Sequence, residues 1–259
     1  MRTLKLTLAY DGTAYAGWQR QPRVPTIQAL LEEALAEIEG RSVVVHGAGR
    51  TDAGVHALGQ VASVQLAHPI EGITLTRALN AKLPEDIRVL RAEEAPDNFH
   101  ARFKARRKVY RYWLSSGPVA LPFDRRYVWH LPNHLNLEDM RQAGVTLCGT
   151  HDFTAFHTAD GNTRAHSTVR TLFALSVNNS PGSGFLGLVP TRLVDYITVD
   201  ITGDGFLRHM VRTITGTLVE VGLGHRTVGT VAKTLATRQR QQAGPTAPPH
   251  GLFLVRIEY

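Results

Sequence analysis

A glycine-rich segment in the first half of the chain carries a single carboxylate. Residues 47–57 have the sequence GAGRTDAGVHA, in which Asp52 follows Arg50 and lies between glycines. Glycine allows tight turns and a close approach of the backbone to a ligand, so Asp52 is a candidate catalytic group. The other interpretation is that Asp52 only closes an Asx turn. The segment is neither a dinucleotide fingerprint, since Asp52 replaces the third glycine, nor a phosphate loop, since it lacks Gly-Lys.

Positive charge gathers in the middle of the chain. The protein has 29 Lys and Arg residues against 22 Asp and Glu, a formal net charge of +7, and no acidic residue occurs between Asp97 and Asp124. Within this interval basic and aromatic residues are interleaved: Arg102, Phe103, Lys104, Arg106, Arg107, Lys108, Tyr110, Arg111, Tyr112 and Trp113. Basic side chains bind phosphates and aromatic rings stack on bases, so the interval predicts nucleic-acid binding. The alternative is an arginine-rich face that contacts only solvent.

A third segment combines a turn, an aromatic residue and two bases. Residues 203–212 have the sequence GDGFLRHMVR, in which Arg208 and Arg212 are four residues apart on one helical face. One interpretation is a pair of surface bases. The other is an arginine held against a sequestered aspartate, which would keep that carboxylate ionised and oriented.

Composition and the remaining reactive residues exclude several classes of protein. With 43% hydrophobic residues and no run of about 20 predominantly apolar ones, the chain is neither disordered nor membrane-spanning. The start of the chain does not resemble a signal peptide, so we expect a soluble, cytoplasmic protein. Cys148 is the single cysteine, and the close pairs His130/His134 and His151/His157 lack helical metal-ligand spacing. We therefore expect no metal site.

Hydrophobic periodicity predicts alternating strands and helices in the first half. Strands are expected at residues 4–10, 43–46, 60–66 and 87–90, and helices from Ile27 to Ile38 and over residues 73–82. Thr26 is the expected cap of the first helix, and Glu32, Glu33 and Glu37 are expected to face water, so this helix would lie away from RNA. The order is βαββαβ.

The second half is expected to repeat that order with longer insertions. Strands are predicted at residues 108–114, 169–177, 193–201 and 252–257. Helices are predicted from an Asn136 cap to residue 147, from an Asp204 cap to about residue 221, and over residues 228–237. We therefore predict an α+β protein of two domains, residues 1–105 with the Asp52 loop and residues 106–259 completing an active-site cleft.

The motifs of this sequence and their order resemble those of the TruA family of tRNA pseudouridine synthases. The blocks that carry the resemblance are YDGTAYAGWQ (residues 10–19), GRTDAGVHA (49–57), FHARF (99–103) with VYRY (109–112), GFLRHMVR (205–212) with EVG (220–222), and APPHGLFL (247–254). They occur in the family's order and cover nearly the whole chain.

The resemblance implies a function for individual residues. Asp52 would be the catalytic aspartate that converts uridine to pseudouridine, Tyr110 would stack on the uracil, Arg212 would pair with the aspartate, and Leu252 would pack in the base pocket. Further substrate contacts are expected from basic residues of the motifs and the basic interval: Arg50, Arg102, Arg106, Arg107 and Arg111. The substrate would be tRNA, at uridines 38, 39 and 40 of the anticodon arm. The resemblance also implies a homodimer that needs no cofactor, with RRM-like halves forming a central antiparallel sheet flanked by helices.

The chain departs from the family pattern at two places. Ser167-Thr168-Val169 stands where Ser-Pro is expected before Arg-Thr, and His157 stands where a basic residue is common. These differences bear on substrate preference. Two other functions remain as alternatives. The first is an RNA-binding module without catalysis, although the strands of this chain lack the stacking motif expected of such a module. The second is a small-molecule enzyme that uses the glycine loop to bind phosphate.

Overall fold

The computed structural model describes residues 1–158, 167–180 and 194–259 of the chain. It divides into two compact units: unit 1 is Met1–Lys108 with Phe253–Tyr259, and unit 2 is Val109–Leu252. The division lies close to the boundary expected between residues 105 and 106, but the last strand of the chain joins unit 1. The cause is strand pairing, since Phe253 and Leu254 lie in parallel register with His56 and Ala57.

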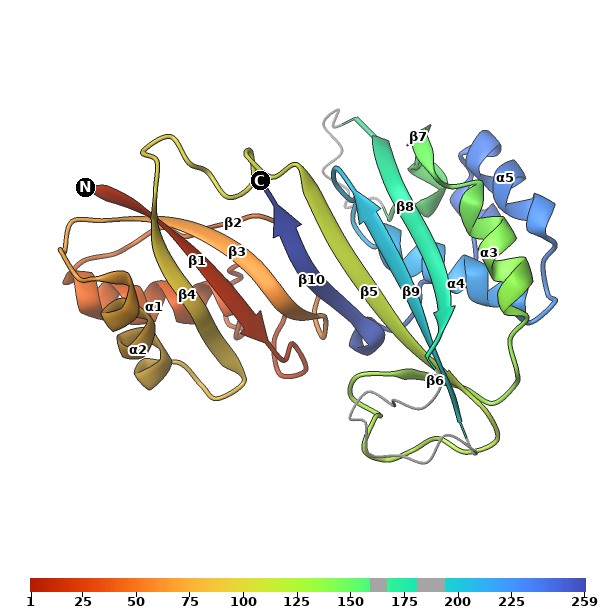
Figure 1. The fold of residues 1–259 in the computed structure, drawn as a ribbon, viewed down its shortest axis with the longest axis horizontal. Helices are drawn as coiled ribbons and strands as arrows, with labels where there is room; N and C mark the ends of the chain where they lie inside the picture. The colour runs from red at the N-terminus through yellow and green to blue at the C-terminus, as the bar shows by residue number, and fades with distance from the viewer. Residues whose placement is uncertain (159–166, 181–193) are drawn as a thin grey trace. The chain divides into compact units, whose positions relative to one another are not determined.

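Unit 1 is a sheet with two helices (Figure 1). Its elements are β1 (Arg2–Tyr10), α1 (Ile27–Glu39), β2 (His46–Gly47), β3 (His56–Leu66), α2 (Gly72–Lys82), β4 (Ile87–Ala95) and, from its second residue on, β10 (Leu252–Glu258). The strand order is β4-β1-β3-β10, with β2 on β3, and β1 is antiparallel to both β3 and β4. The βαββαβ order predicted for the first half is therefore present.

Helix α1 begins where the sequence predicts. The Oγ1 of Thr26 accepts a hydrogen bond from the backbone N–H of Ala29 at 3.4 Å, which satisfies one of the free donors of the first turn. Ile27, Leu31 and Leu35 are fully buried, because their spacing puts them on one face of the helix.

Two expectations around α1 are wrong for one shared reason. Glu32 does not face water but is buried, and residues 43–45 do not form a strand, because only His46–Gly47 pairs with β3. The Glu32 carboxylate accepts a hydrogen bond from the N–H of Val45, and the Gln28 amide donates to the Val45 carbonyl. Side chains of α1 thus satisfy the backbone groups that a strand neighbour would otherwise bind.

Unit 2 combines further strands with three helices. Its elements are β5 (Arg107–Ser116, whose first two residues belong to unit 1), β6 (Trp129–Leu131), α3 (Leu137–Val145), β7 (Gly149–Asp152), the 3₁₀ turn η1 (Thr154–Phe156), β8 (Val169–Asn179), β9 (Asp195–Gly203), α4 (Met210–Gly222), α5 (Val228–Thr237) and the 3₁₀ turns η2 (Arg240–Gln242) and η3 (Pro249–Gly251). The strand order is β5-β9-β8-β7, with β6 on β5, and α3 contacts both α4 and α5 (Figure 1). The short strands β6 and β7 were not predicted, and Leu193, the first residue of the strand expected over residues 193–201, lies outside the described residues.

Helix α4 starts later than predicted. Asp204 is not its cap: the Asp204 carboxylate accepts from the N–H of Thr171, and the Asp204 N–H donates to the Thr171 carbonyl. The aspartate therefore joins the end of β9 to β8, and the helix begins at Met210 after His209. Most of the strand pairs are antiparallel and the chain also forms helices, which confirms the α+β class. In the part of the chain that the structure describes, every helix is too short or too polar to cross a lipid bilayer.

Candidate active site

The loop that carries Asp52 connects β2 to β3 in unit 1 and is held by main-chain hydrogen bonds. The N–H of Trp18 donates to the Thr51 carbonyl at 3.1 Å, and the N–H of Gly54 donates to the Tyr15 carbonyl at 3.3 Å. Within the loop, the N–H of Val55 donates to the Asp52 carbonyl at 3.1 Å. These bonds fix the backbone on both sides of Asp52, whose side chain is half-buried.

Glycines bring the segment of residues 10–19 into direct contact with this loop. A Cβ at Gly12 would lie 2.0 Å from the Val55 carbonyl oxygen, and one at Gly17 would lie 2.4 Å from that of Thr51. Gly17 also has a φ of +89°, a conformation that side chains rarely adopt. The first and second motifs of the sequence are thus two halves of one local structure.

A buried hydroxyl network supports the loop from below. The Tyr10 hydroxyl and Thr51 Oγ1 are 2.8 Å apart, and the Gln60 amide donates to the Gly49 carbonyl at 2.8 Å and to the Tyr10 oxygen at 3.4 Å. Burial raises the pKa of Tyr10 to about 12, so the phenol stays protonated at neutral pH. Sequence analysis missed Tyr10 and Gln60 as supports, because their contacts join residues far apart in the chain.

Arg50 lies in the same loop as Asp52 but is exposed. Its Nε donates to Gln19 Oε1 at 3.0 Å, so the first motif also orients this guanidinium. Arg50 is therefore available at the surface beside the carboxylate loop.

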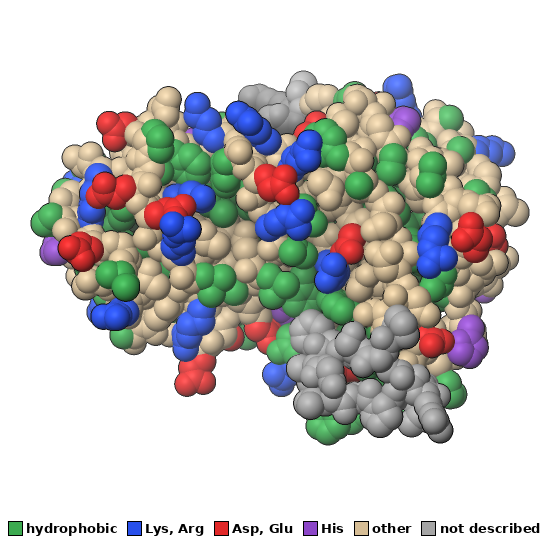
Figure 2. Space-filling view, viewed as in Figure 1, with side chains coloured by type: hydrophobic (Ala, Val, Ile, Leu, Met, Phe, Trp, Pro, Cys, Tyr) green, Lys and Arg blue, Asp and Glu red, His purple; other side chains and the backbone are tan. Residues whose placement is uncertain are grey.

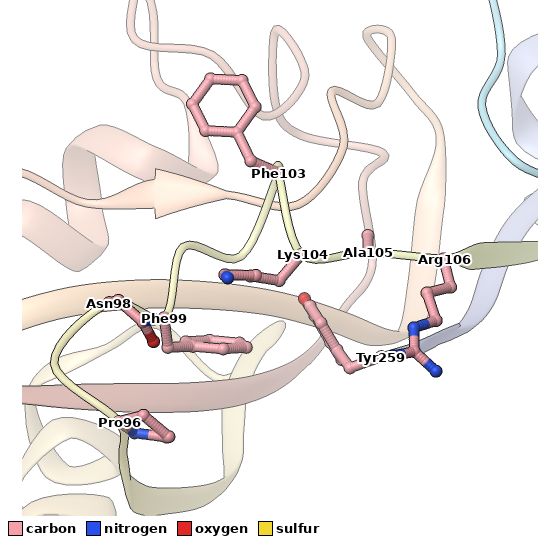
Figure 3. Close-up of a pocket in the computed structure, with 8 residues that line it drawn as sticks. All are labelled: Pro96, Asn98, Phe99, Phe103, Lys104, Ala105, Arg106 and Tyr259. Carbon is pink, nitrogen blue, oxygen red and sulfur yellow. The ribbon is translucent and has the colours of Figure 1, made fainter.

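The start of the basic interval is exposed on unit 1. Arg102, Phe103, Arg106 and Arg107 are all exposed, with 75% of Phe103 accessible. An open pocket of about 430 Å³ lies in this region, and its lining includes Phe99, Phe103, Lys104, Arg106 and Tyr259. Figure 3 shows the Phe103 ring turned away from Phe99 and Tyr259. Basic side chains on the face in Figure 2 lie among acidic and apolar ones without forming one continuous patch.

Tyr110 and Arg111 of the basic interval belong to unit 2. Tyr110 is 6% exposed and packs edge-on against Phe206, with ring centres 5.1 Å apart. Arg111 makes a bidentate ion pair with Asp200, at 2.7 and 3.1 Å, and this contact raises the pKa of Arg111. Arg111 is thus bound to a carboxylate within its own unit.

The last motif is attached to the core of unit 2. Arg212, the third residue of α4, donates from Nε to the Ala247 carbonyl at 2.7 Å, and the Tyr112 hydroxyl donates to the Pro248 carbonyl at 2.7 Å. A Cβ at Gly251 would lie 2.5 Å from the Tyr112 ring. These contacts position the segment just before Leu252, which is buried at the start of β10.

The predicted site residues are therefore distributed over both units. Asp52, Arg50, Arg102, Arg106 and Arg107 belong to unit 1, while Tyr110, Arg111, Arg212 and Leu252 belong to unit 2. In the described ranges, no three His, Cys, Asp or Glu side chains are grouped so that they could hold a metal ion.

Comparisons with known proteins agree with the order of the motifs. The sequence pattern of a family described as tRNA pseudouridine synthase matches residues 7–104 and 143–259. Three curated relatives carry the name tRNA pseudouridine synthase A. The protein from Thermoanaerobacter sp. (strain X514) is 41% identical, covering 100% of both chains. That from Geobacter sp. (strain M21) is 42% identical over 100% of this chain and 99% of its own, and that from Myxococcus xanthus is 43% identical over 100% and 92%.

The match extends over most of the chain and includes both the Asp52 loop and the Arg212 helix. The identity to each of these relatives exceeds 40% over the whole length of this chain. The chain therefore belongs to the tRNA pseudouridine synthase family, a family of isomerases.

Proposed function

We propose that this protein converts uridine to pseudouridine in tRNA at positions 38, 39 and 40 of the anticodon arm, with Asp52 as the catalytic carboxylate. The observation that carries the proposal is the Asp52 loop itself. Main-chain bonds from Trp18 and Val55 hold the backbone around a carboxylate that stays half-buried. A group held in this way loses little freedom when the substrate binds.

The chemistry suits the residues of this chain. Isomerisation breaks the C–N glycosidic bond, turns the base and forms a C–C bond to the same sugar carbon, without net oxidation or reduction. A carboxylate at Asp52 could attack the sugar or the base as a nucleophile, or remove a proton from the sugar. Each of these routes requires the carboxylate to be ionised and oriented.

Residues of unit 2 complete the proposed mechanism. Tyr110 stacks on the uracil, Leu252 packs beside it, and Arg212 pairs with Asp52 and orients it. Stacking on an aromatic ring is worth about 1–3 kcal/mol per base, which offsets part of the cost of taking the uridine out of the folded arm.

We propose that the enzyme acts as a cytoplasmic homodimer that binds tRNA across both subunits.

Basic residues of unit 1 position the RNA backbone. Arg50 and the exposed Arg102, Arg106 and Arg107 contact phosphates, which orient the substrate without specifying its sequence. Arg111 contributes to RNA binding only indirectly, because its guanidinium is bound to Asp200.

The test is tritium release from tRNA labelled as [5-³H]uridine, because forming the C–C bond at carbon 5 must expel that hydrogen. We expect Asp52→Asn to reduce release at least about 10³-fold while tRNA affinity stays within about twofold. Asp97→Asn, which changes an exposed carboxylate of the same unit, is the control and should release tritium at the wild-type rate.

Position and catalysis are tested separately. A tRNA with cytidine at 38, 39 and 40 should release no tritium with the wild type. Release by Asp52→Asn near the wild-type rate would exclude its catalytic role. Binding without release by any variant would favour an RNA-binding module.

A further inference from the structure

Unit 2 contains a strongly basic pocket, which shares no lining residue with the unit 1 pocket of Figure 3. The pocket has a volume of about 740 Å³ and is lined by three arginines, two histidines and three threonines. Its five basic residues are His157, His209, Arg212, Arg238 and Arg240. None of the lining residues is acidic, so the pocket suits an anion rather than a cation.

Positive charge in this pocket is only partly neutralised. Arg240 donates to two neutral acceptors, the Gly244 carbonyl and Thr246 Oγ1, each at 3.0 Å. Within the described ranges no carboxylate lies at ion-pair distance from Arg240, and burial lowers the pKa of its guanidinium. Arg238 does have a partner, Asp152, at 3.2 Å. A partly buried cation without a counter-ion is costly, and an anion from outside would remove that cost.

Two of these residues have an unusual, left-handed backbone conformation. His209 has a φ of 63° and Arg238 a φ of 58°, which makes them two of the three non-glycine residues with positive φ in the described chain. His209 precedes the first turn of α4 but makes no side-chain cap bond to it, and its Nδ1 lies 3.1 Å from Thr158 Oγ1 instead. The positive end of the α4 dipole therefore has no side-chain acceptor from its cap residue, which adds to the attraction for an anion.

We propose that this pocket binds a phosphate group of the tRNA backbone close to the target uridine. The proposal rests on the proposed function and deepens it. Arg212 connects the two, because it lines the pocket and is also the residue that we propose to pair with Asp52. Arginine forks and threonine hydroxyls are donors that match phosphate oxygens.

His157 is a further candidate phosphate contact in this pocket. Among the residues that the structure describes, its imidazole has no hydrogen-bond partner, although its backbone N–H donates to the Thr154 carbonyl. The side chain is thus available to a ligand at the pocket wall.

The first test compares the salt dependence of tRNA binding. Each phosphate contact adds close to one unit to the slope of log affinity against log salt, so His157→Ala and Arg238→Gln should each reduce this slope, Arg238→Gln by about 1. Loss of a charged hydrogen bond should raise the Kd of Arg238→Gln roughly tenfold. Arg41→Gln is the matched control: Arg41 is 49% exposed against 64% for Arg238, and is also paired with a carboxylate, Glu39 at 2.9 Å. It follows α1 and should leave both quantities unchanged.

The second test locates the phosphate. Single uncharged methylphosphonate linkages are placed one at a time between nucleotides 37 and 41 of a ligated tRNA. For the wild type one linkage should weaken binding most, and Arg238→Gln should show no further loss at that linkage, since both changes remove the same contact. Equal, additive losses at every linkage would overturn the proposal.

Inorganic phosphate distinguishes a nucleic-acid contact from a site for free phosphate. Phosphate that competes with wild-type tRNA, but not with tRNA carrying the sensitive methylphosphonate, supports the proposal. Phosphate binding without any methylphosphonate effect, or unchanged salt slopes in both variants, overturns it. Tritium release keeps the two proposals distinguishable: a wild type that releases tritium while the variants bind normally disproves only the pocket.

Discussion

The Asp52 loop of unit 1 and the basic pocket of unit 2 are built in opposite ways. Around Asp52 the supports are neutral: main-chain bonds, glycine contacts and the hydroxyls of Tyr10 and Thr51. In the basic pocket the walls include three arginine side chains, and His209 and Arg238 adopt the strained left-handed conformation. A reacting group needs a fixed backbone, whereas a polyanion needs uncompensated positive charge.

This contrast separates stability from salt dependence. Neutral, buried contacts are little affected by salt, so damage to the Asp52 loop should reduce stability and turnover at any ionic strength. Damage to an exposed basic surface should instead change affinity in a salt-dependent way.

Gly17→Ala should break the support of the Asp52 loop. The new Cβ would lie 2.4 Å from the Thr51 carbonyl at a φ of +89°, so the backbone must move. We expect a loss of about 2–4 kcal/mol in the free energy of unfolding, measured by urea denaturation, together with lower turnover.

Gly229→Ala is the control for this substitution. Gly229 lies in α5 of unit 2 with nothing within 4 Å of its Cβ position, so alanine should stabilise the protein by up to about 1 kcal/mol. Equal stability of the Gly17 variant and the wild type would show that the two motifs are not rigidly joined.

Tyr10→Phe should lower stability by about 1 kcal/mol at pH 7, because Thr51 loses its hydroxyl partner. Burial raises the pKa of Tyr10 from 10.0 to about 12. The protonated phenol is therefore favoured in the folded state, and its contribution is fully present below pH 10 and lost as pH rises to about 12. In this window the wild type should lose up to about 1.4 kcal/mol per pH unit more than Tyr10→Phe.

Tyr112→Phe provides the comparison in unit 2. Burial also raises the pKa of Tyr112, whose hydroxyl donates to the Pro248 carbonyl. This variant should show a similar change in alkaline unfolding but act on the segment before Leu252. Parallel alkaline unfolding curves of Tyr10→Phe and the wild type would contradict the buried, protonated Tyr10.

Arg106→Ala and Arg107→Ala should each flatten the salt dependence of tRNA binding by about one unit of slope. Arg111→Gln is the matched variant from the same interval and should leave the slope unchanged, since its guanidinium donates to both carboxylate oxygens of Asp200, at 2.7 and 3.1 Å. The ion pair of Arg238 differs, because it joins one nitrogen to one oxygen of Asp152 at 3.2 Å. Loss of the half-exposed ion pair of Arg111 should cost at most about 1 kcal/mol of stability. A larger slope change in Arg111→Gln than in the other two would reverse the assignment of RNA contacts.

Local patterns predict the elements of this fold wherever local interactions are sufficient. Thr26 and Asn136 cap the helices that they were expected to cap, and α5 spans the predicted residues. Prediction fails where a distant partner takes the hydrogen bonds. Val45 is bonded to side chains of α1, and Asp204 is bonded to Thr171 rather than to the start of a helix.

The sequence alone determines the family, the α+β class and the identity of the candidate carboxylate, because ordered motifs, hydrophobic period and caps are all local in the chain. Only the tertiary structure decides that Gly12 and Gly17 support the Asp52 loop, that Arg111 is occupied by Asp200 while Arg106 is exposed, and that His157, Arg238 and Arg240 line one pocket. Such contacts join residues far apart in the chain, and their energies depend on burial and on the nearest charge, neither of which a local pattern contains.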